Sequence, residues 1–228
     1  MKISYRYLLL AKLVVISIFS ILSFKGIAQT NAIGLPLKAR AVIDGISYKA
    51  IVNKDTSVSI VSGNGKSARK VHLSLDYSTI SSFKFEDFDG DGFKDIFIEF
   101  FSNLPGDCDV YLYNPSRKNF THVTDIGRYP SAIKIIGTKY YYSYHRSGCA
   151  DEDWDSDLFF IKDFKAIRIG NISGNACDEN NPGVFISRII GNNKKMVEKF
   201  NVHILEKYKS QKWGFIDSYW KKNYRKFV

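Results

Sequence analysis

Histidine and cysteine are scarce in this chain, with four and three copies among 228 residues. No two histidines stand at a spacing that suits a zinc ion, and the sequence holds no Gly-x-Ser-x-Gly segment. These absences argue against the common zinc sites and exclude the nucleophile elbow of the α/β-hydrolases. His145 lies near Cys149, but this pair suits a thiol nucleophile only if Cys149 is reduced, so we expect a structural histidine.

The odd number of cysteines limits the chain to one internal disulfide. Cys149 follows Ser147-Gly148 and Cys177 follows Gly174-Asn175-Ala176, and both surroundings are polar and loop-like. We therefore predict a Cys149–Cys177 disulfide, and the pairing of Cys108 with Cys149 stays open as an alternative. In the first pairing, Cys108 is a free, buried thiol at the start of a strand.

The apolar run near the N-terminus, from Leu13 to Phe24, is shorter than the roughly 20 residues of a membrane span. Lys2 and Arg6 precede this run, and small residues lead up to Ala28. The arrangement predicts a signal peptide over residues 1–28, and an uncleaved N-terminal anchor is the alternative. The predicted location is periplasmic or secreted, where disulfides persist.

Acidic residues are in the minority, with 23 Asp and Glu against 33 Lys and Arg. Four of the basic residues and none of the acids lie in 1–28, which lowers the net charge from +10 to +6 for residues 29–228. This moderate charge and the predicted export argue against nucleic-acid binding. Residues 29–228 are long enough to form a single domain with its own core.

Helical periodicity is nearly absent before residue 215, where short strand-like segments alternate with Asp, Asn, Gly and Pro turns instead. The predicted strands are 38–44, 47–53, 57–62, 66–74, 81–86, 95–101, 109–113, 119–124, 131–136, 138–145, 157–162, 165–170 and 184–190. Many short strands with frequent turns predict an all-β fold of antiparallel sheets, arranged as a sandwich, a barrel or a propeller.

The segment 215–227 differs, because its apolar residues recur on one side of a helix while Lys221, Lys222 and Arg225 lie elsewhere. The apolar residues are Phe215, Ile216, Tyr219, Trp220, Tyr224 and Phe227. We predict a C-terminal amphipathic helix that packs on the sheet. A helix lying on a membrane surface is the alternative.

The segment from Asp87 to Asp95 carries the clearest chemical signal, because four aspartates stand close together with two glycines between them. Asp87, Asp89, Asp91 and Asp95 offer side-chain oxygens, and the Phe93 carbonyl can point between them. Calcium takes about 6–8 oxygen ligands, and glycine permits the sharp turn of a closed cage. We predict a calcium site formed by these five residues, with a solvated Asp-Gly turn as the alternative.

This loop is not an EF-hand, which has a glutamate at position 12 and a helix on each side. Position 12 counted from Asp87 is Ile98, and the flanking segments 83–86 and 96–101 are typical of strands. The sequence therefore predicts a metal loop that joins two strands.

The segment 140–144 is dense in tyrosine, and Tyr140, Tyr142 and Tyr144 share one face if it forms a strand. Tyrosine is favoured in binding interfaces because its ring is large, rigid and amphipathic. We therefore interpret the three residues as partner-binding anchors, and cross-strand packing is the alternative.

A second acidic run, 151–157, follows, and we predict that Trp154 within it is buried in the core. If the partner is basic, Asp151, Asp153 and Asp155 are the acids that we expect to meet it. The same run is a weaker candidate for a second cation site or for the acid pair of a glycoside hydrolase.

Residues 85–97 resemble the calcium loops of FG-GAP and VCBS-type β-propeller proteins, through their aspartates and through Gly90 and Gly92. A longer stretch, roughly 80–180, resembles a family of small periplasmic proteins with an irregular propeller fold. The matching segments are 111–115, 118–120, 148–150, Trp154 and 156–161. One class in that family is an immunity protein that binds calcium and inhibits a lysozyme-like effector of type IV secretion.

The resemblance implies an irregular, small β-propeller-like fold of antiparallel sheets, with a β-sandwich as the alternative. It also implies an exported calcium-binding protein that binds a protein partner, such as a peptidoglycan hydrolase, and has no catalytic role of its own. A carbohydrate- or peptidoglycan-active enzyme that uses residues 151–157, and a purely structural envelope module, are the alternatives.

Overall fold

The structure is a computed structural model that describes residues 38–53, 57–63, 69–73 and 80–228. The described residues fall within one unit, Gly34–Val228. The predicted signal peptide, 1–28, lies outside them. Within the described ranges, no helix is long and apolar enough to cross a bilayer.

The described strands form three antiparallel sheets, and most neighbouring strands follow one another in sequence. Sheet A contains β1 (Lys38–Ile43), β2 (Ile46–Val52), β3 (Val58–Ser62) and β4 (Arg69–Leu73). Sheet B contains β5 (Ile80–Glu86), β6 (Asp95–Phe100), β7 (Cys108–Asn114) and β8 (Asn119–His122). Sheet C contains β9 (Ile133–Lys134), β10 (Tyr140–Tyr142), β11 (His145–Gly148), β12 (Asp153–Lys162), β13 (Lys165–Asn175), β14 (Gly183–Ile190) and β15 (Asn193–Phe200).

Among the described residues, the helical elements are short, apart from one helix near the C-terminus. They are the 3₁₀ helices η2 (Ile126–Arg128), η3 (Cys149–Asp151), η4 (Val202–Lys207) and η5 (Tyr224–Phe227), and the α-helix α2 (Lys212–Asn223). The predicted all-β class with a C-terminal helix is therefore confirmed. The sheets have four, four and seven strands, so their arrangement as a propeller stays a prediction.

Sheets A and B share one hydrophobic core, which is consistent with the sandwich alternative. The core contains Tyr48, Ala50 and Val52 from β2, and Ile96 and Ile98 from β6, all of them almost fully buried. Alternate residues of β2 and β6 face inward, which is why these strands were recognisable from their apolar periodicity.

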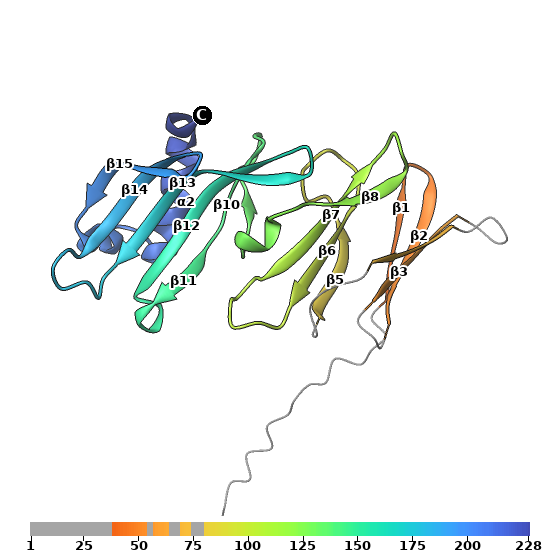
Figure 1. Cartoon of the computed structure of the whole chain (residues 1–228), viewed down its shortest axis with the longest axis horizontal. Coiled ribbons are helices and arrows are strands. Elements are labelled where there is room, and N and C mark those ends of the chain that lie inside the picture. The colour runs from red at the N-terminus through yellow and green to blue at the C-terminus, as the bar shows by residue number, and fades with distance from the viewer. Residues whose placement is uncertain (1–37, 54–56, 64–68, 74–79) are drawn as a thin grey trace, which may run out of the picture. The chain divides into compact units, whose positions relative to one another are not determined.

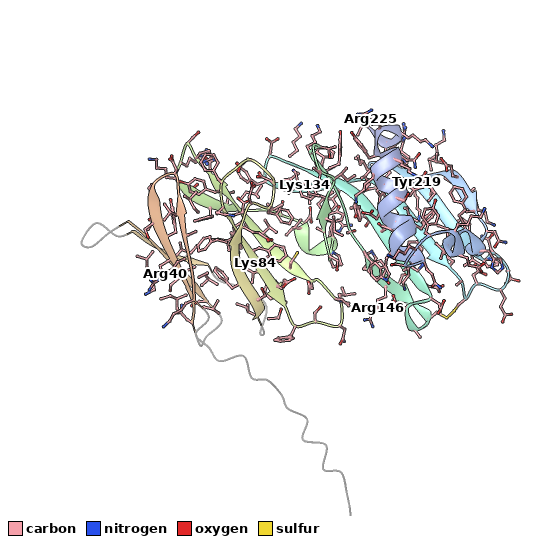
Figure 2. The ribbon with its side chains drawn as sticks, turned by 180° about the vertical axis from the view of Figure 1, so that it is seen from behind. Arg40, Lys84, Lys134, Arg146, Tyr219 and Arg225 are labelled. Atoms are coloured by element: carbon pink, nitrogen blue, oxygen red, sulfur yellow. A yellow bond between two sulfur atoms is a disulfide. The ribbon has the colours of Figure 1, made fainter. Side chains whose placement is uncertain are left out.

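Helix α2 covers one face of sheet C, and Figure 1 shows it behind strands β12–β14. Phe215, Ile216 and Trp220 of the helix are at least 98% buried and pack with Leu158 and Ile172 of the sheet. Tyr219 lies on the same helix (Figure 2). The prediction of a packed amphipathic helix is thus confirmed, although the α-helix begins at Lys212 and ends at Asn223.

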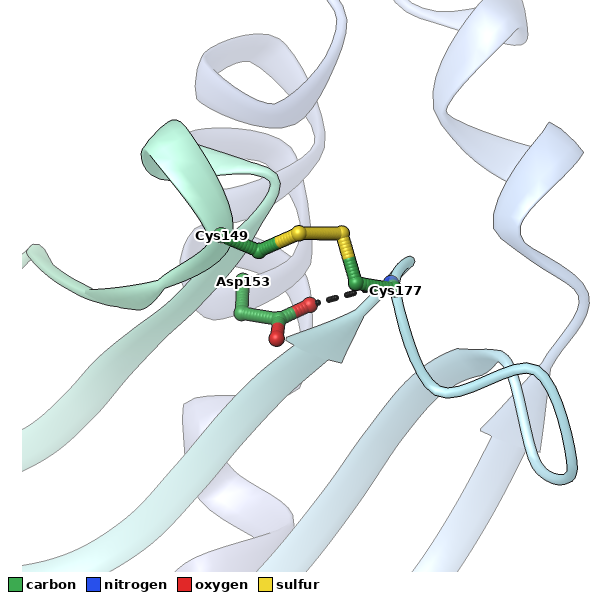
Figure 3. Close-up of side chains that lie close together, drawn as sticks. All are labelled: Cys149, Asp153 and Cys177. Atoms are coloured by element: carbon green, nitrogen blue, oxygen red, sulfur yellow. Dashed lines mark hydrogen bonds between the residues drawn. A yellow bond between two sulfur atoms is a disulfide. The ribbon is translucent and has the colours of Figure 1, made fainter.

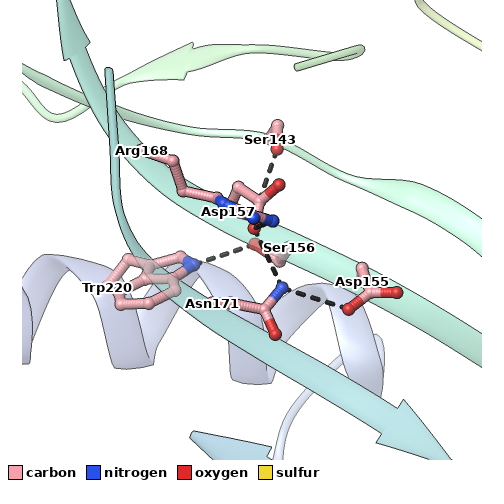
Figure 4. Close-up of polar contacts among 7 residues, drawn as sticks. All are labelled: Ser143, Asp155, Ser156, Asp157, Arg168, Asn171 and Trp220. Carbon is pink, nitrogen blue, oxygen red and sulfur yellow. Dashed lines mark hydrogen bonds and ion pairs between the residues drawn. The ribbon is translucent and has the colours of Figure 1, made fainter. Parts of the chain in front are cut away.

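Trp220 approaches the sheet closely because residue 170 of β13 is a glycine. A Cβ atom at Gly170 would lie 3.1 Å from the Trp220 ring and 2.9 Å from the Phe227 ring. The indole Nε1 of Trp220 donates a hydrogen bond of 2.8 Å to Ser156 Oγ, which is itself fully buried (Figure 4). The helix is therefore held by ring packing and by one buried polar contact.

A third hydrophobic cluster joins residues of sheet B to residues of sheet C. Val110 and Leu112 of β7 belong to it, together with Tyr141 of β10 and Phe159 of β12. The Tyr141 and Phe159 rings stack with centroids 5.2 Å apart. Phe88, from the predicted metal loop, packs against the same cluster.

Several strand boundaries differ from the sequence prediction. β12 begins at Asp153, β13 extends to Asn175, and within the segment 131–136 the strand β9 covers Ile133–Lys134 alone. β15 was not predicted, because four of its first six residues are polar or charged and it lies at the open edge of sheet C. Its lysines fit that position, since charged side chains on an edge strand oppose pairing with other chains.

Candidate metal centre

The predicted metal loop connects β5 to β6, as expected, and the last residue of β5, Glu86, pairs with Asp95. Gly90 and Gly92 have φ angles of +74° and +95°, which an L side chain rarely adopts. These two glycines turn the chain back on itself over a few residues. The strand–loop–strand arrangement confirms that the segment is not an EF-hand.

Carboxylates inside the loop bind its own backbone N–H groups. Asp87 accepts hydrogen bonds from Gly90 N at 2.7 Å and from Gly92 N at 3.1 Å. Asp89 accepts one from Asp91 N at 3.1 Å, and Asp91 accepts one from Phe93 N at 2.8 Å. The loop is therefore shaped by its acidic side chains, which are the residues proposed to hold the metal.

Asp95 lies deepest and is 0% exposed. Its two oxygens accept hydrogen bonds from Tyr113 N at 2.8 Å and from Phe88 N at 2.9 Å. Burial raises the pKa of Asp95 to about 7, although these hydrogen bonds act in the opposite direction. Burial, followed by repulsion from Asp91, also raises the pKa of Asp89.

Three of the four predicted carboxylates come together, since oxygens of Asp87, Asp89 and Asp95 lie within 4.8 Å of one another. Asp91 is exposed and is not part of this group. The Phe93 carbonyl ligand stays a prediction, and the Phe93 ring packs against Tyr113 with centroids 5.6 Å apart. Clustered hard oxygens, one of them on a fully buried acid, fit the donor set that calcium prefers.

Lys134 is a neighbour of the loop that the sequence did not reveal. Its Nζ donates a hydrogen bond to the Asp89 carbonyl and another, of 3.3 Å, to the Tyr141 hydroxyl. Burial lowers the pKa of Lys134, while Asp89 and the other loop aspartates oppose this shift. No local sequence pattern could have predicted this contact, because 45 residues separate Lys134 from Asp89 in the sequence.

Phe88 also ties the loop to sheet C. Its ring stacks on Tyr141 with centroids 5.3 Å apart and an interplanar angle of 12°. The Phe88 ring also stacks on Phe97 of β6, with centroids 5.9 Å apart. The metal loop is therefore part of the packed contact between sheets B and C.

Tyr142 and Tyr144 are not exposed anchors, so the prediction is wrong for these two tyrosines, and for Tyr140 it stays a prediction. Tyr142 and Tyr144 are 4% and 5% exposed, and Tyr140 is half-buried. Tyr142 donates a hydrogen bond of 2.5 Å to Asp217 of α2, and Tyr144 donates one to Asp151. Strand alternation places these tyrosines on one face but does not show what covers that face. Helix α2 and the segment before it cover it, so these rings belong to the core.

The acidic run does not form a free acidic surface either. Lys212 forms an ion pair of 2.8 Å with Asp151. Although burial raises the pKa of Asp151, hydrogen bonds from Lys212 and Tyr144 lower it overall. Asp155 accepts a hydrogen bond of 3.0 Å from Asn171. The prediction that Trp154 is buried is confirmed, at 2% exposure.

The third acid, Asp153, supports the disulfide. Cys149 and Cys177 are bonded, with their Cα atoms 6.5 Å apart, which confirms the predicted pairing (Figure 3). Asp153 Oδ1 accepts hydrogen bonds from Ala176 N at 2.9 Å and Cys177 N at 3.2 Å. Asp153 groups with the two sulfurs, but the disulfide occupies both of them, so we do not assign a metal there. Cys108 is the free, buried cysteine, as predicted.

Beside the metal loop lies a cavity of about 480 Å³. Asp87 and Phe88 of the loop contribute to its wall, and Lys84, Glu99, Ile133 and Lys134 are among the other lining residues. Figure 2 labels Lys84 and Lys134. Lys84 lies over the Phe97 ring at 4.6 Å, and Lys134 lies over the Tyr141 ring at 4.8 Å. The cavity therefore combines aromatic faces with charges of both signs.

Comparison with known proteins assigns no family to the chain. No protein-family model matches it, and no curated protein matches it. Among solved structures, it is similar to a Xanthomonas type IV secretion system related protein, at 16% sequence identity and a TM-score of 0.47. The similarity covers 71% of this chain and 93% of that protein.

Proposed function

We propose that this chain is an exported, calcium-binding protein that acts by binding a protein partner in the cell envelope. The observation that carries the calcium proposal is the Asp87, Asp89 and Asp95 group, whose oxygens lie within 4.8 Å of one another. Asp95 is fully buried, so its ionised form is costly without a bound cation. A calcium ion would neutralise this charge and the repulsion within the group.

Export is proposed from the signal-like segment 1–28 and from the Cys149–Cys177 disulfide, which persists in oxidising compartments. In such compartments calcium binding would be structural. The loop packs through Phe88 on Tyr141, so a bound ion would stabilise the contact between sheets B and C.

Calcium removal should destabilise the protein. We expect one calcium per chain, and a melting temperature about 5–10 °C lower in a chelator, because a ligand at 100 times its Kd stabilises the native state by about 2.7 kcal/mol. The Asp89→Ala variant should lose most of this difference. Glu152→Gln is the matched control, since Glu152 is exposed and lies outside the loop. Titration calorimetry that detects no calcium uptake at millimolar concentration would contradict the proposal.

The partner surface is proposed at the cavity beside the loop. Ile133 lines this cavity and is 49% exposed, and Ile136 nearby is 91% exposed. The β6–β7 loop adds Phe101 and Leu104, which are 57% and 41% exposed. Ser131 holds the two segments together, because its Oγ donates to the Pro105 carbonyl at 3.0 Å. Exposed apolar side chains on segments that hydrogen bonds hold in place are typical of protein-binding surfaces.

A peptidoglycan hydrolase is the partner that we propose, on the resemblance of residues 80–180 to the immunity-protein family. The purified chain should inhibit at least one enzyme in a panel of lysozymes when calcium is present. Ile133→Arg should weaken this inhibition by about tenfold or more, as expected for a central apolar contact. Ile190→Arg is the control, because Ile190 is 60% exposed on β14, outside the cavity. If the chain inhibits no lysozyme of the panel at micromolar concentration, the proposal of a hydrolase partner is wrong. If a chelator leaves the inhibition unchanged, the inhibition does not depend on calcium.

A further inference from the structure

The face of sheet C opposite α2 is polar and partly open. Residues that alternate with the buried apolar ones point to this face, among them Asp155, Asn171 and Ser187. Asn171 Nδ2 donates to Asp155 at 3.0 Å and to Asp157 at 2.9 Å (Figure 4). Arg168 lies 3.5 Å from Asp157. Arg168 therefore balances the charge of Asp157, and Asn171 donates a hydrogen bond to each of the two acids near β12.

Farther along the same face lies a separate cavity of about 330 Å³. It is formed by β13, β14, β15 and the loop between β13 and β14. The lining residues are Ser173, Asn175, Asn181, Phe185, Ser187, Lys194 and Met196. None of them is acidic. The volume lies at the small end of the range of about 300–1,000 Å³ for ligand cavities, which suits a small molecule.

The polar groups of this cavity include one cation and several hydrogen-bond donors. Asn175 Oδ1 accepts a hydrogen bond from Ser173 Oγ at 3.1 Å, and Asn181 Oδ1 accepts one from Lys199 Nζ at 2.6 Å. Each amide oxygen therefore already accepts one hydrogen bond, and neither Nδ2 group donates a hydrogen bond to another described residue, so the N–H groups face the cavity as donors. Lys194 has no carboxylate partner among the described residues. An acceptor-rich, anionic group complements such a wall.

The loop that supplies Asn181 is held in place. Asp178 Oδ1 accepts hydrogen bonds from Asn180 N and from Asn181 N, both at 3.1 Å. The Cys149–Cys177 disulfide and Asp153 fix the start of the same loop. Binding would therefore require little ordering of this segment, which lowers its entropic cost.

The cavity also has an apolar side. Phe185 is half-buried, and Lys199 lies over its ring at 5.0 Å. Met196 is 60% exposed and stands opposite Ser187 in the strand register. An aromatic ring and a thioether favour a methyl or acyl group next to the anion.

We propose that this cavity binds a small carboxylate that carries an acylamino or short apolar group. Lys194 and the amide N–H groups of Asn175 and Asn181 would receive the carboxylate, and Phe185 and Met196 would contact the apolar part. The site does not involve the metal loop, so it stands independently of the proposed calcium function.

Binding of N-acetyl-alanine tests the proposal, with N-acetyl-alaninamide as a neutral probe of the same size. Two-dimensional NMR of the whole chain should show saturable shifts at residues 173–187, with a Kd in the range of about 1–10 mM. The amide should bind at least about fivefold more weakly. Added salt should weaken binding of the carboxylate more than binding of the amide.

Two neighbouring lysines provide matched variants. Lys194→Gln should weaken binding of N-acetyl-alanine about tenfold or more, because it removes the unpaired cation. Lys195→Gln should change it less than about twofold, since Lys195 pairs with Arg188 in the register and does not line the cavity. Both lysines are exposed, so the fold should be preserved. No saturable shifts at about 20 mM probe, equal binding of the amide, or equal effects of the two variants would each overturn the proposal.

Discussion

Replacing Trp220 with alanine should cost about 3–5 kcal/mol of the free energy of unfolding, which is the usual range for a buried tryptophan. The side chain is 0% exposed and packs against Gly170 and Phe227. Its loss would leave a cavity between α2 and sheet C, and would also leave the buried Ser156 hydroxyl without its donor. Urea denaturation monitored by circular dichroism measures the change.

Two variants separate the packing of Trp220 from its hydrogen bond. Trp220→Phe keeps an aromatic ring but removes the indole N–H, so it should cost about 1–3 kcal/mol. Lys222→Ala, on an exposed position of the same helix, should change stability by less than about 0.5 kcal/mol. A loss below about 1 kcal/mol for Trp220→Ala would mean that the helix does not depend on this contact, and would reopen the membrane-surface alternative.

Removing the disulfide should cost about 2–4 kcal/mol, because the open chain gains conformational freedom mainly in the unfolded state. The residues bridged are 28 positions apart in the sequence. The variant that carries both Cys149→Ser and Cys177→Ser should remain folded, since Asp153 can still accept hydrogen bonds from the backbone N–H groups at positions 176 and 177. Its urea midpoint should fall, with little change in the slope of the transition.

The wild-type chain provides the control for this measurement. A reducing agent should lower its stability by the same amount and leave the double variant unaffected. The denatured, non-reduced chain should contain one free thiol, Cys108. In the native state that thiol should react slowly, because burial raises the pKa of Cys108 to about 12 and keeps it protonated. Three free thiols in the denatured chain would contradict the assignment.

Features that depend on short-range chemistry were predictable from the sequence. The Asp and Gly pattern of 87–95 indicated a tight loop between two strands, because carboxylate spacing and glycine conformation act over a few residues, and its calcium site stays a prediction. The apolar stripe of α2 indicated a packed helix. Cysteine parity and polar surroundings indicated the disulfide. Each of these signals lies within the segment that it describes.

The roles of the tyrosines and acids could not be predicted in the same way. Alternation along β10 shows which side chains share a face, but it does not show what covers that face. Asp217, which receives the hydrogen bond of Tyr142, lies 75 residues further along the chain. Lys212, which pairs with Asp151, lies 61 residues away. Burial and charge pairing at these positions follow from where α2 packs.

The sequence by itself determined the all-β class, the loop of Asp and Gly between two strands and the helix stripe, and it favoured the Cys149–Cys177 pairing, because local chain geometry and composition decide these features. The tertiary structure decided that Asp95 is fully buried, that Lys134 contacts the metal loop, and that Tyr142 and Tyr144 lie in the core. It also assembled a donor-rich cavity from three strands and a loop. Such features need groups from distant segments, and only the packing of the whole chain places those groups together.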